Sequence, residues 1–206
     1  YATRNGGGVF VNSNGVANFE GCDIHDNTAL YGGGVYVAPN GVANFEGCDI
    51  HDNTADMSGG GVFVDSGGVA NFESCNIHDN AAPYGGGLYI SGTATLTNTN
   101  VYSNQASSWW QGGGLFISGT ATLTNTNVHS NQASLGGGLL IYGTATLTNS
   151  NVYSNQADDG PNVYVDVTGT LTVSYLMELT GVYGSFTVLP APPPSPPTLP
   201  PPPTRP

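Results

Sequence analysis

Gly32-Gly33-Gly34-Val35-Tyr36-Val37 opens the stretch that decides the fold of this chain. Gly41-Val42-Ala43-Asn44-Phe45 and Asp49-Ile50-His51-Asp52-Asn53 follow it, and most of the remaining sequence repeats this pattern. Glycine triplets recur at intervals of 26, 27, 26, 27 and 24 residues, and they begin at Gly6, Gly32, Gly59, Gly85, Gly112 and Gly136. A degenerate seventh copy starts at Gly160. A fixed period of this length is typical of a solenoid.

The contents of one period indicate which solenoid to expect. Each copy holds three short apolar or alternating runs, which in the second copy are 35–37, 42–45 and 49–52. None is long enough for a helix, which needs about ten residues. Strands this short match one coil of a parallel β-helix, where each strand pairs with its counterpart one coil on at about 4.8 Å. We therefore predict an all-β parallel β-helix solenoid of about seven coils, with 24–27 residues and three strands in each.

The domain organisation follows from the extent of the repeat. Residues 1–188 are predicted to form the β-helix, with a divergent, cap-like last coil over 160–188, and residues 189–206 a Pro-rich tail. Residues 2–5 precede the first glycine triplet as 28–31 precede the second, so the first coil is expected to present an unpaired strand edge. The alternative is a cap that lies upstream. A chain that begins at Tyr1 is expected to be a processed or partial product.

Charge excludes several kinds of partner. The 206 residues include 14 acidic and 2 basic side chains, with no lysine, and the arginines are Arg4 and Arg205. A net charge of −12 argues against nucleic acid or an anionic membrane surface as partner, because both require clustered Lys and Arg. No apolar run approaches the ~20 residues of a membrane span, and Tyr1 does not begin a signal peptide.

The first strand of each coil predicts a row of aromatic rings on the outside of the solenoid. Side chains alternate between faces, so the flanking aliphatic residues point inward and the middle residue points outward. We call these middle residues the aromatic strip: Phe10, Tyr36, Phe63, Tyr89, Phe116 and Tyr164, with Leu140 as the exception. An exposed strip would either stabilise the sheet by stacking or form an interface with sugar rings or another subunit. A facing error of one residue would instead bury these rings.

The second strand predicts the opposite inward wall and an array of threonines. Pairs such as Ala43 and Phe45, or Ala121 and Leu123, should point inward, whereas Thr93, Thr95, Thr97 and their equivalents point outward. No charged residue occurs between Asn80 and Ala157. Either O-linked sugar on these threonines or hydration of the hydroxyls would keep this surface soluble.

An asparagine recurs in the turn after the third strand, and we interpret it as structural. Asn tolerates the left-handed conformation of a sharp turn, and stacked amides can hydrogen-bond from coil to coil. The members of this Asn ladder are Asn27, Asn53, Asn80, Asn104, Asn131 and Asn155.

Three cysteines occupy one equivalent position, and Thr99, Thr126 and Ser150 continue it. Cys22, Cys48 and Cys75 would lie about 4.8 Å apart at Cα, within the range for a disulfide. One disulfide with a spare thiol, or a ladder of small buried residues, are both consistent with this spacing.

Histidines stack in the same way. His25, His51 and His78 have aspartates beside them, but ligands strung along a line do not converge as a tetrahedral metal site requires. We therefore expect a solvated polar ladder with no metal and no cofactor. The Gly-Gly-x-Gly-x-Asp calcium repeat is absent.

The repeat resembles a known group of proteins. A glycine triplet with an aliphatic strand, Thr-Leu-Thr-Asn and a closing Asn-x-Ala, clearest over 112–133, is similar to the right-handed parallel β-helices of the pectate-lyase-like superfamily, in its non-enzymatic surface type. The resemblance extends to about residue 180 and implies a right-handed coil. It specifies the fold far better than the function, because that superfamily includes lyases, hydrolases, adhesins and structural surface proteins.

The chemistry that the resemblance implies for the enzymes is missing here. Their lyases use Arg or Lys beside calcium-binding aspartates, and their hydrolases use an aspartate cluster with His and an Arg-x-Lys element. The repeat contains no lysine and no arginine, and Asp158-Asp159 is the one adjacent acidic pair. We interpret that pair as a turn before Gly160 and predict no catalytic residue.

The tail differs sharply in composition, because 189–206 holds eleven of the fourteen prolines. It is expected to form a polyproline II rod that advances about 3.1 Å per residue. It resembles hydroxyproline-rich glycoproteins of plants and green algae, and the alternative is an interdomain linker. None of the 21 asparagines lies in an Asn-x-Ser/Thr sequon, which leaves O-linked modification open. The expected hydroxylation or glycosylation positions are Pro192, Pro193, Pro194, Ser195, Pro196, Pro197, Thr198, Pro200, Pro201, Pro202, Pro203 and Thr204.

Together these patterns favour a non-catalytic extracellular protein at the cell surface. We expect a structural subunit that associates head to tail with copies of itself, through coil ends, aromatic strip and tail, into a glycosylated filament or appendage. The alternatives are an adhesin or cell-wall protein that binds carbohydrate on the aromatic strip, and a polysaccharide lyase or hydrolase.

Overall fold

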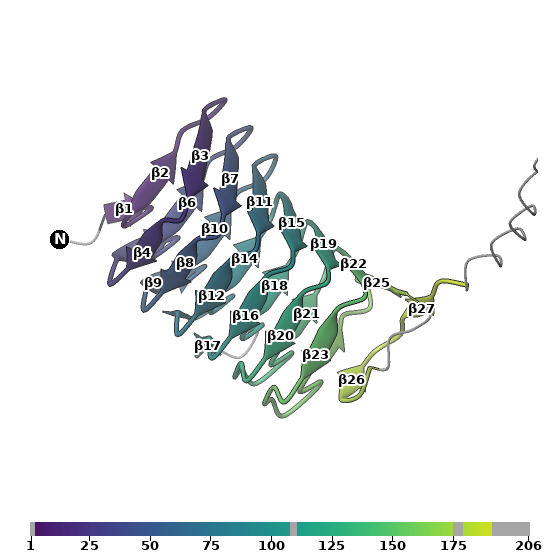
Figure 1. The fold of residues 1–206 in the computed structure, drawn as a ribbon. Helices are drawn as coiled ribbons and strands as arrows, with labels where there is room; N and C mark the ends of the chain where they lie inside the picture. Colours follow the sequence, from purple (N-terminus) through teal and green to yellow (C-terminus); the bar gives the residue numbers. More distant parts are fainter. Residues whose placement is uncertain (1–2, 108–110, 175–178, 191–206) are drawn as a thin grey trace, which may run out of the picture.

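The repeat winds into a stack of coils along one axis (Figure 1). The structure is a computed structural model that describes residues 3–107, 111–174 and 179–190. All regular elements in these ranges are strands, and every ladder is parallel and joins equivalent positions of neighbouring coils, such as Val35 with Val62. We number the coils 1 to 7 from the start of each repeat at Gly6, Gly32, Gly59, Gly85, Gly112, Gly136 and Gly160. The predicted parallel β-helix is confirmed, with about six complete turns and a partial seventh.

Four sheets, which we name A to D, run along the axis. Sheet A consists of β1 (Thr3–Asn5), β5 (Thr28–Tyr31), β9 (Thr54–Ser58), β13 (Ala81–Ala82) and β17 (Gln105–Ala106). Sheet B consists of β2 (Val9–Val11), β6 (Val35–Val37), β10 (Val62–Val64), β14 (Leu88–Ile90), β18 (Leu115–Ile117), β21 (Leu139–Ile141), β24 (Val163–Val165) and β26 (Val182–Tyr183). Each coil passes through sheets B, C, D and then A.

The remaining two sheets complete the coil. Sheet C consists of β3 (Val16–Glu20), β7 (Val42–Glu46), β11 (Val69–Glu73), β15 (Thr93–Thr97), β19 (Thr120–Thr124), β22 (Thr144–Thr148), β25 (Thr170–Val173) and β27 (Thr187–Val188). Sheet D consists of β4 (Asp23–His25), β8 (Asp49–His51), β12 (Asn76–His78), β16 (Asn100–Tyr102), β20 (Asn127–His129) and β23 (Asn151–Tyr153).

Sheets B, C and D are the three strands per coil that the sequence predicts, and sheet A is a fourth that it does not. The strands of sheet A are short and irregular: β13 and β17 have two residues each, and the register shifts between β5 and β9. Runs this short carry no alternation from which a strand can be predicted.

Two of the three glycines in each triplet have a clear steric reason. Gly32 has φ 62°, a left-handed conformation that side chains disfavour. A Cβ on Gly33 would overlap the carbonyl oxygens of Gly60 and Thr54, which belong to the next coil and to sheet A. The triplet therefore marks the sharp corner between sheets A and B, where neighbouring coils approach most closely.

The core is a narrow apolar column lined by sheets B, C and D. Val35 and Val37 of β6, Ala43 and Phe45 of β7, and Ile50 of β8 are fully or almost fully buried. The same positions are buried in the following coils, which confirms the predicted inward facing of the first two strands. In coils 1 to 3 the column contains a stack of phenylalanines with ring centroids 4.9 Å apart, and leucine takes their place in coils 4 to 6.

The two ends of the described chain continue the same pattern. β1 pairs with β5, with Thr3 opposite Ala29 and Asn5 opposite Tyr31, so residues 3–5 take the position that ends a coil, as expected. At the other end β26 and β27 pair with β24 and β25, and Leu189 donates a backbone hydrogen bond to Val173. No helix in the described ranges is long and apolar enough to span a membrane.

Candidate functional site

The outer face of sheet D has a continuous stack of six aromatic or imidazole rings. Neighbouring ring centroids are 4.6–5.3 Å apart, and the rings are nearly parallel. The members are His25, His51, His78, Tyr102, His129 and Tyr153. Only the stacking of the first three is predicted from the sequence. The others share the same position in the repeat, so comparing coils position by position would have found them.

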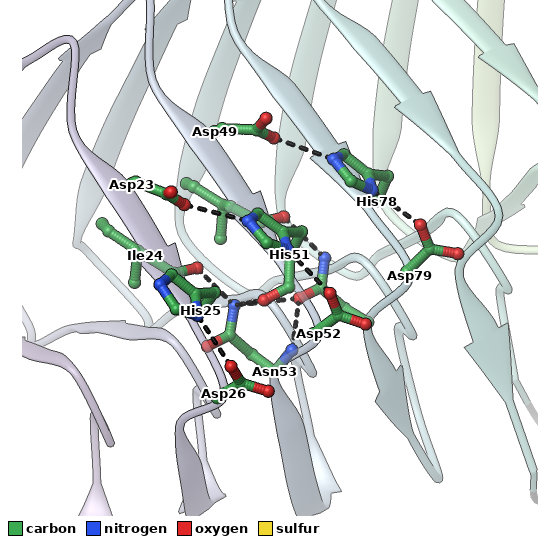
Figure 2. A network of polar contacts seen from close by, with 12 residues as sticks. Asp23, Ile24, His25, Asp26, Asp49, His51, Asp52, Asn53, His78 and Asp79 are labelled. Atoms are coloured by element: carbon green, nitrogen blue, oxygen red, sulfur yellow. Dashed lines mark hydrogen bonds and ion pairs between the residues drawn. The ribbon is translucent and has the colours of Figure 1, made fainter.

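Aspartates clamp the second and third histidines from both sides (Figure 2). Nδ1 of His51 lies 2.7 Å from Oδ2 of Asp52 in its own coil, and Nε2 lies 2.9 Å from Oδ1 of Asp23 in the preceding coil. Because each nitrogen faces a carboxylate, the arrangement favours the doubly protonated imidazolium. The hydrogen bond with Asp52, together with that to Asp23, raises the pKa of His51, and burial opposes this effect.

The clamp repeats one coil on but is incomplete in coil 1. His78 lies 2.7 Å from Asp79 and 2.9 Å from Asp49, whereas His25 has an ion pair only with Asp26, at 2.8 Å. In His51 and His78 a carboxylate thus faces each of the two nitrogens through which an imidazole could bind a metal. Across the described residues no three His, Cys, Asp or Glu side chains converge on a metal-sized site. The chemistry available to this cluster is proton binding and release.

His129 shows what the ring stack does without carboxylates. Its Nδ1 lies 3.1 Å from Oγ of Ser130, which stands where coils 1 to 3 have aspartate. Burial alone lowers the pKa of His129. Two histidines at equivalent positions therefore have pKa shifts of opposite sign.

The predicted Asn ladder is buried from Asn53 onward, and its amides bond from coil to coil. In Asn53 the amide nitrogen donates to the carbonyl of Ile24 at 2.8 Å and to Oδ1 of Asn80 at 3.0 Å, and the backbone N–H also donates to Asn80 Oδ1. Asn162 continues the ladder beyond Asn155. The predicted amide stacking is confirmed, but the predicted left-handed backbone is wrong for Asn. The positive φ belongs to the residue before it: Asp26, Asp52, Asp79, Ser103, Ser130 and Ser154.

A second asparagine ladder, which was not predicted from the sequence, lies on the outer face of sheet D. Asn100 donates to Asn76 at 3.1 Å, Asn127 to Asn100 at 3.0 Å, and Asn151 to Asn127 at 3.0 Å. Coils 1 and 2 have Asp23 and Asp49 at this position, each paired with the histidine of the following coil. Each aspartate at this position therefore pairs with a histidine. The asparagines that occupy the position in coils 3 to 6 bond to one another.

The three cysteines are free and form a ladder of thiols. The Cys48 thiol donates to the carbonyl of Phe19 at 3.5 Å, and the Cys75 thiol to that of Glu73 at 3.3 Å. Thr99 and Thr126 continue the ladder with hydroxyls that donate in the same way. Of the two alternatives, the structure has the ladder and no disulfide. Burial raises the pKa of Cys75 to about 11, so this thiol is a poor nucleophile at neutral pH.

The aromatic strip is stacked as predicted, but the prediction of an exposed strip is wrong for most of its length. Consecutive rings from Phe10 to Phe116 lie 4.8–5.4 Å apart and point away from the column. Tyr36, Phe63 and Phe116 are nevertheless only 7–9% exposed, and Leu140 is fully buried. Only Phe10 at the first coil is largely exposed, while Tyr89 and Tyr164 are half-buried. The predicted outward direction of these side chains is correct. They are buried because other residues cover the strip.

Those covering residues come from the end of sheet A and from the turn after sheet B. Tyr31 packs edge-on against Phe63 at 5.5 Å, Tyr84 edge-on against Phe116 at 6.3 Å, and Tyr142 stacks on Phe116 at 5.5 Å. Tyr36 also donates its hydroxyl to Asp65. A hollow of about 350 Å³ remains between the covering rings, lined by Tyr31, Met57, Ser58, Tyr84, Tyr89, Phe116 and Tyr142. A hollow of about 320 Å³ adjoins it at Tyr31.

The outer face of sheet C changes character along the axis. In coils 1 to 3 it presents an amide row, in which Asn44 donates to Asn18 and Asn71 donates to Asn44, both at 2.8 Å. Beside this row Glu20, Glu46 and Glu73 stand in register, and the two rows line a hollow of about 570 Å³. In coils 4 to 6 threonines take both rows. A third row, at the position of Val69, consists of Thr93, Thr120 and Thr144, which are exposed.

The remaining predictions concern one acidic pair and the tail. Asp158 and Asp159 are exposed residues of the turn before Gly160, where the Asp159 carbonyl accepts from Gly136 at 3.0 Å. The expected modification positions from Pro192 to Thr204 lie outside the described residues.

Four parallel sheets wound about one apolar column define the class of protein, a parallel β-helix solenoid. The chain belongs to the family described as the right-handed beta helix region, whose model matches residues 7–174. No curated protein and no solved structure matches the chain. The fold alone does not assign an activity.

Proposed function

We propose that this chain is a structural, non-catalytic subunit of an extracellular filament or surface appendage, in which copies join end to end. The observation that carries the proposal is the coil-to-coil bonding of its polar side chains. The Asn ladder, the thiol and hydroxyl ladder and the ring stack of sheet D all run parallel to the axis. Such ladders cross-link each coil to the next, so they stiffen a rod in the direction in which a filament is pulled.

The surface of coils 4 to 6 supports an extracellular, glycosylated form of the protein. It has no charged residue between Asn80 and Ala157, yet it exposes a regular array of threonine hydroxyls on sheet C. Sugars on these hydroxyls or on the tail would supply the hydration that charge does not. The free thiols are compatible with this location, since Cys48 and Cys75 are buried.

Electron microscopy of the native material, with an intact mass from the same sample, tests the proposal. We expect regular fibres whose subunit mass exceeds the 21.1 kDa of the bare chain. Dispersed particles at the bare mass would refute both the filament and the glycosylation.

A second candidate function is that of a carbohydrate-binding adhesin or cell-wall protein. The hollow over sheet C favours it more than the aromatic strip, which is mostly buried. Amides and carboxylates such as Asn44 and Glu46 line that hollow, and these groups can donate to and accept from sugar hydroxyls. A glycan array probed with the full chain and with Glu46→Gln tests this candidate. Retained binding by Glu46→Gln, or no binding by the full chain, would count against it.

A polysaccharide lyase or hydrolase ranks last among these proposals. The acidic side chains of sheet C stand in a row along the axis, and Asp158 and Asp159 are turn residues. Cleavage of a polyuronide by the original chain, and its loss in Asp158→Asn or Asp159→Asn, would favour this proposal over the other two.

A further inference from the structure

Three aromatic side chains stand over the covered part of the strip and leave a groove between them. Tyr31 and Tyr84 project from the ends of coils 1 and 3, and Tyr142 from the turn after β21. The register of sheet A aligns Tyr31 with Ser58 and Ser58 with Tyr84, so two large rings flank one small side chain. Tyr31 and Tyr84 are half-buried, and their hydroxyls make no hydrogen bond with any other described residue. The groove thus combines apolar walls with unused donors.

We propose that this groove binds residues 191–206 of the Pro-rich tail of a second copy of the chain. The inference rests on the proposed end-to-end assembly and names the two surfaces that meet. Grooves lined by aromatic rings recognise polyproline II segments, because proline rings pack between the aromatic rings and tyrosine hydroxyls donate to the unbonded carbonyls.

The spacing of the groove matches the pitch of the proposed ligand. Tyr31 and Tyr84 are two coil steps apart, about 9.6 Å. One turn of polyproline II is three residues and advances about 9.3 Å. Successive turns of a tail that lies parallel to the axis would therefore meet the groove at equivalent positions. Ser58 between the two rings leaves the space that one proline ring would fill.

The length of the tail is sufficient. The groove extends from Tyr31, which directly precedes coil 2, to Tyr142 in coil 6, which is four coil steps or about 19 Å. About six residues of polyproline II cover that distance, and the sixteen residues from 191 to 206 would reach about 50 Å. The tail's one charged side chain, Arg205, would enter a molecule of net charge −12, and the hollow that adjoins the groove holds both Asp65 and Arg4.

The position at which the described chain ends favours a second copy over the same molecule. The strands of sheet C run from sheet B toward sheet D, so the chain leaves β27 at the corner between sheets C and D. The groove lies at the corner between sheets A and B, on the opposite side of the coil.

Fluorescence anisotropy of a labelled synthetic peptide of residues 189–206, titrated with the full chain, tests the groove. We expect saturable binding that weakens about tenfold or more in Tyr84→Ala, since one aromatic anchor is removed. Ser58→Tyr should weaken binding equally by filling the gap while it extends the row of rings. Tyr153→Ala, which removes an exposed ring from sheet D, is the matched control and should bind as the original chain does. Circular dichroism verifies that each variant is folded.

Sedimentation velocity of the full chain tests the second copy. We expect association that increases with concentration and is reversed by excess peptide. Absence of peptide binding would overturn the groove, even where electron microscopy shows fibres. Binding by Tyr84→Ala and Ser58→Tyr as tight as that of the original chain would overturn it too. A monomer at all concentrations would overturn the assignment to a second copy. Peptide binding without fibres in the native material would instead refute the proposed filament.

Discussion

Coils 1 to 3 and coils 4 to 6 share the same four sheets but have two sets of side chains. In the core Phe72 is the last ring of the phenylalanine stack and Leu96 begins the leucines. On the outside Glu73 gives way to Thr97, and at the corner Cys75 gives way to Thr99. Ten of the fourteen acidic residues lie in the first three coils and none in the next three until the turn at Asp158.

The comparison teaches that most ladder positions change at the same boundary. In a parallel, in-register stack each side chain touches its own equivalents in the two neighbouring coils. A ring between two rings, or an amide between two amides, keeps both contacts, whereas each change of type breaks one. Changing most rows at one boundary keeps the number of mismatched contacts low. The Asn ladder, which is common to both halves, crosses the boundary unbroken from Asn80 to Asn104.

The core rows give the largest expected difference between the halves. Phe45→Ala should lower the free energy of unfolding by about 4 kcal/mol and Leu123→Ala by about 3 kcal/mol, because each leaves a cavity in a fully packed column. Urea unfolding followed by circular dichroism measures both. Thr122→Ala, on the outer face beside Leu123, is the control and should change stability by less than about 0.5 kcal/mol. Equal losses for Leu123→Ala and Thr122→Ala would show that coils 4 to 6 are not packed as described.

The Asn ladder should respond equally in the two halves. Asn53→Ala and Asn131→Ala each leave buried backbone groups without partners, so each should cost about 3 kcal/mol. The exposed Asn151, which also bonds to an asparagine of the preceding coil, is the matched control, and Asn151→Ala should cost less than about 1 kcal/mol. The same urea titrations measure these variants. A loss of stability for only one of Asn53→Ala and Asn131→Ala would show that the ladder is not equivalent in the two halves.

The pKa values of His51 and His129 should be shifted in opposite directions. The folded-state pKa of His51 is raised, so its clamp contributes fully below the ordinary histidine pKa of about 6.5 and is lost as pH rises through the raised value. The pKa of His129 is lowered, so its protonation opposes folding as pH falls below about 6.5. Titration of the two imidazole signals by NMR measures this difference.

Asp23→Asn sharpens that measurement. It removes one carboxylate from His51 and should lower the pKa of His51, while His129 is unchanged because no carboxylate contacts it. Equal titration of His51 and His129 in the original chain would contradict the clamp.

The three thiols should differ least, and only in the rate at which they are alkylated. Cys22 is half-buried, whereas Cys48 and Cys75 are buried and burial raises the pKa of both. Iodoacetamide at neutral pH should therefore modify Cys22 before the other two, which mass spectrometry of peptides from timed samples can follow. Replacement of Cys75 by Thr should change stability by less than about 1 kcal/mol, because Thr99 makes the same kind of hydrogen bonds in the next coil. Equal rates at the three thiols would show that the ladder opens readily.

The amino-acid sequence by itself determined the solenoid, its repeat and the inward facing of its core. This was predictable because an in-register stack gives every structural requirement a fixed place in the repeat, so Val35, Phe45 and Asn53 each recur about 26 residues apart. The equivalence of Cys22, Cys48 and Cys75 was readable for the same reason, and so was the stacking of the aromatic strip.

Only the tertiary structure decided which surfaces are free. The strip was expected to be exposed, but Tyr31, Tyr84 and Tyr142 cover it from the irregular part of the coil, where the repeat varies in length and carries no periodic signal. The diagonal pairing of His51 with Asp23 likewise depends on how two coils are offset in space. Periodicity along the chain fixes what lies inside one column, whereas contacts across a corner depend on loop conformations that no period specifies.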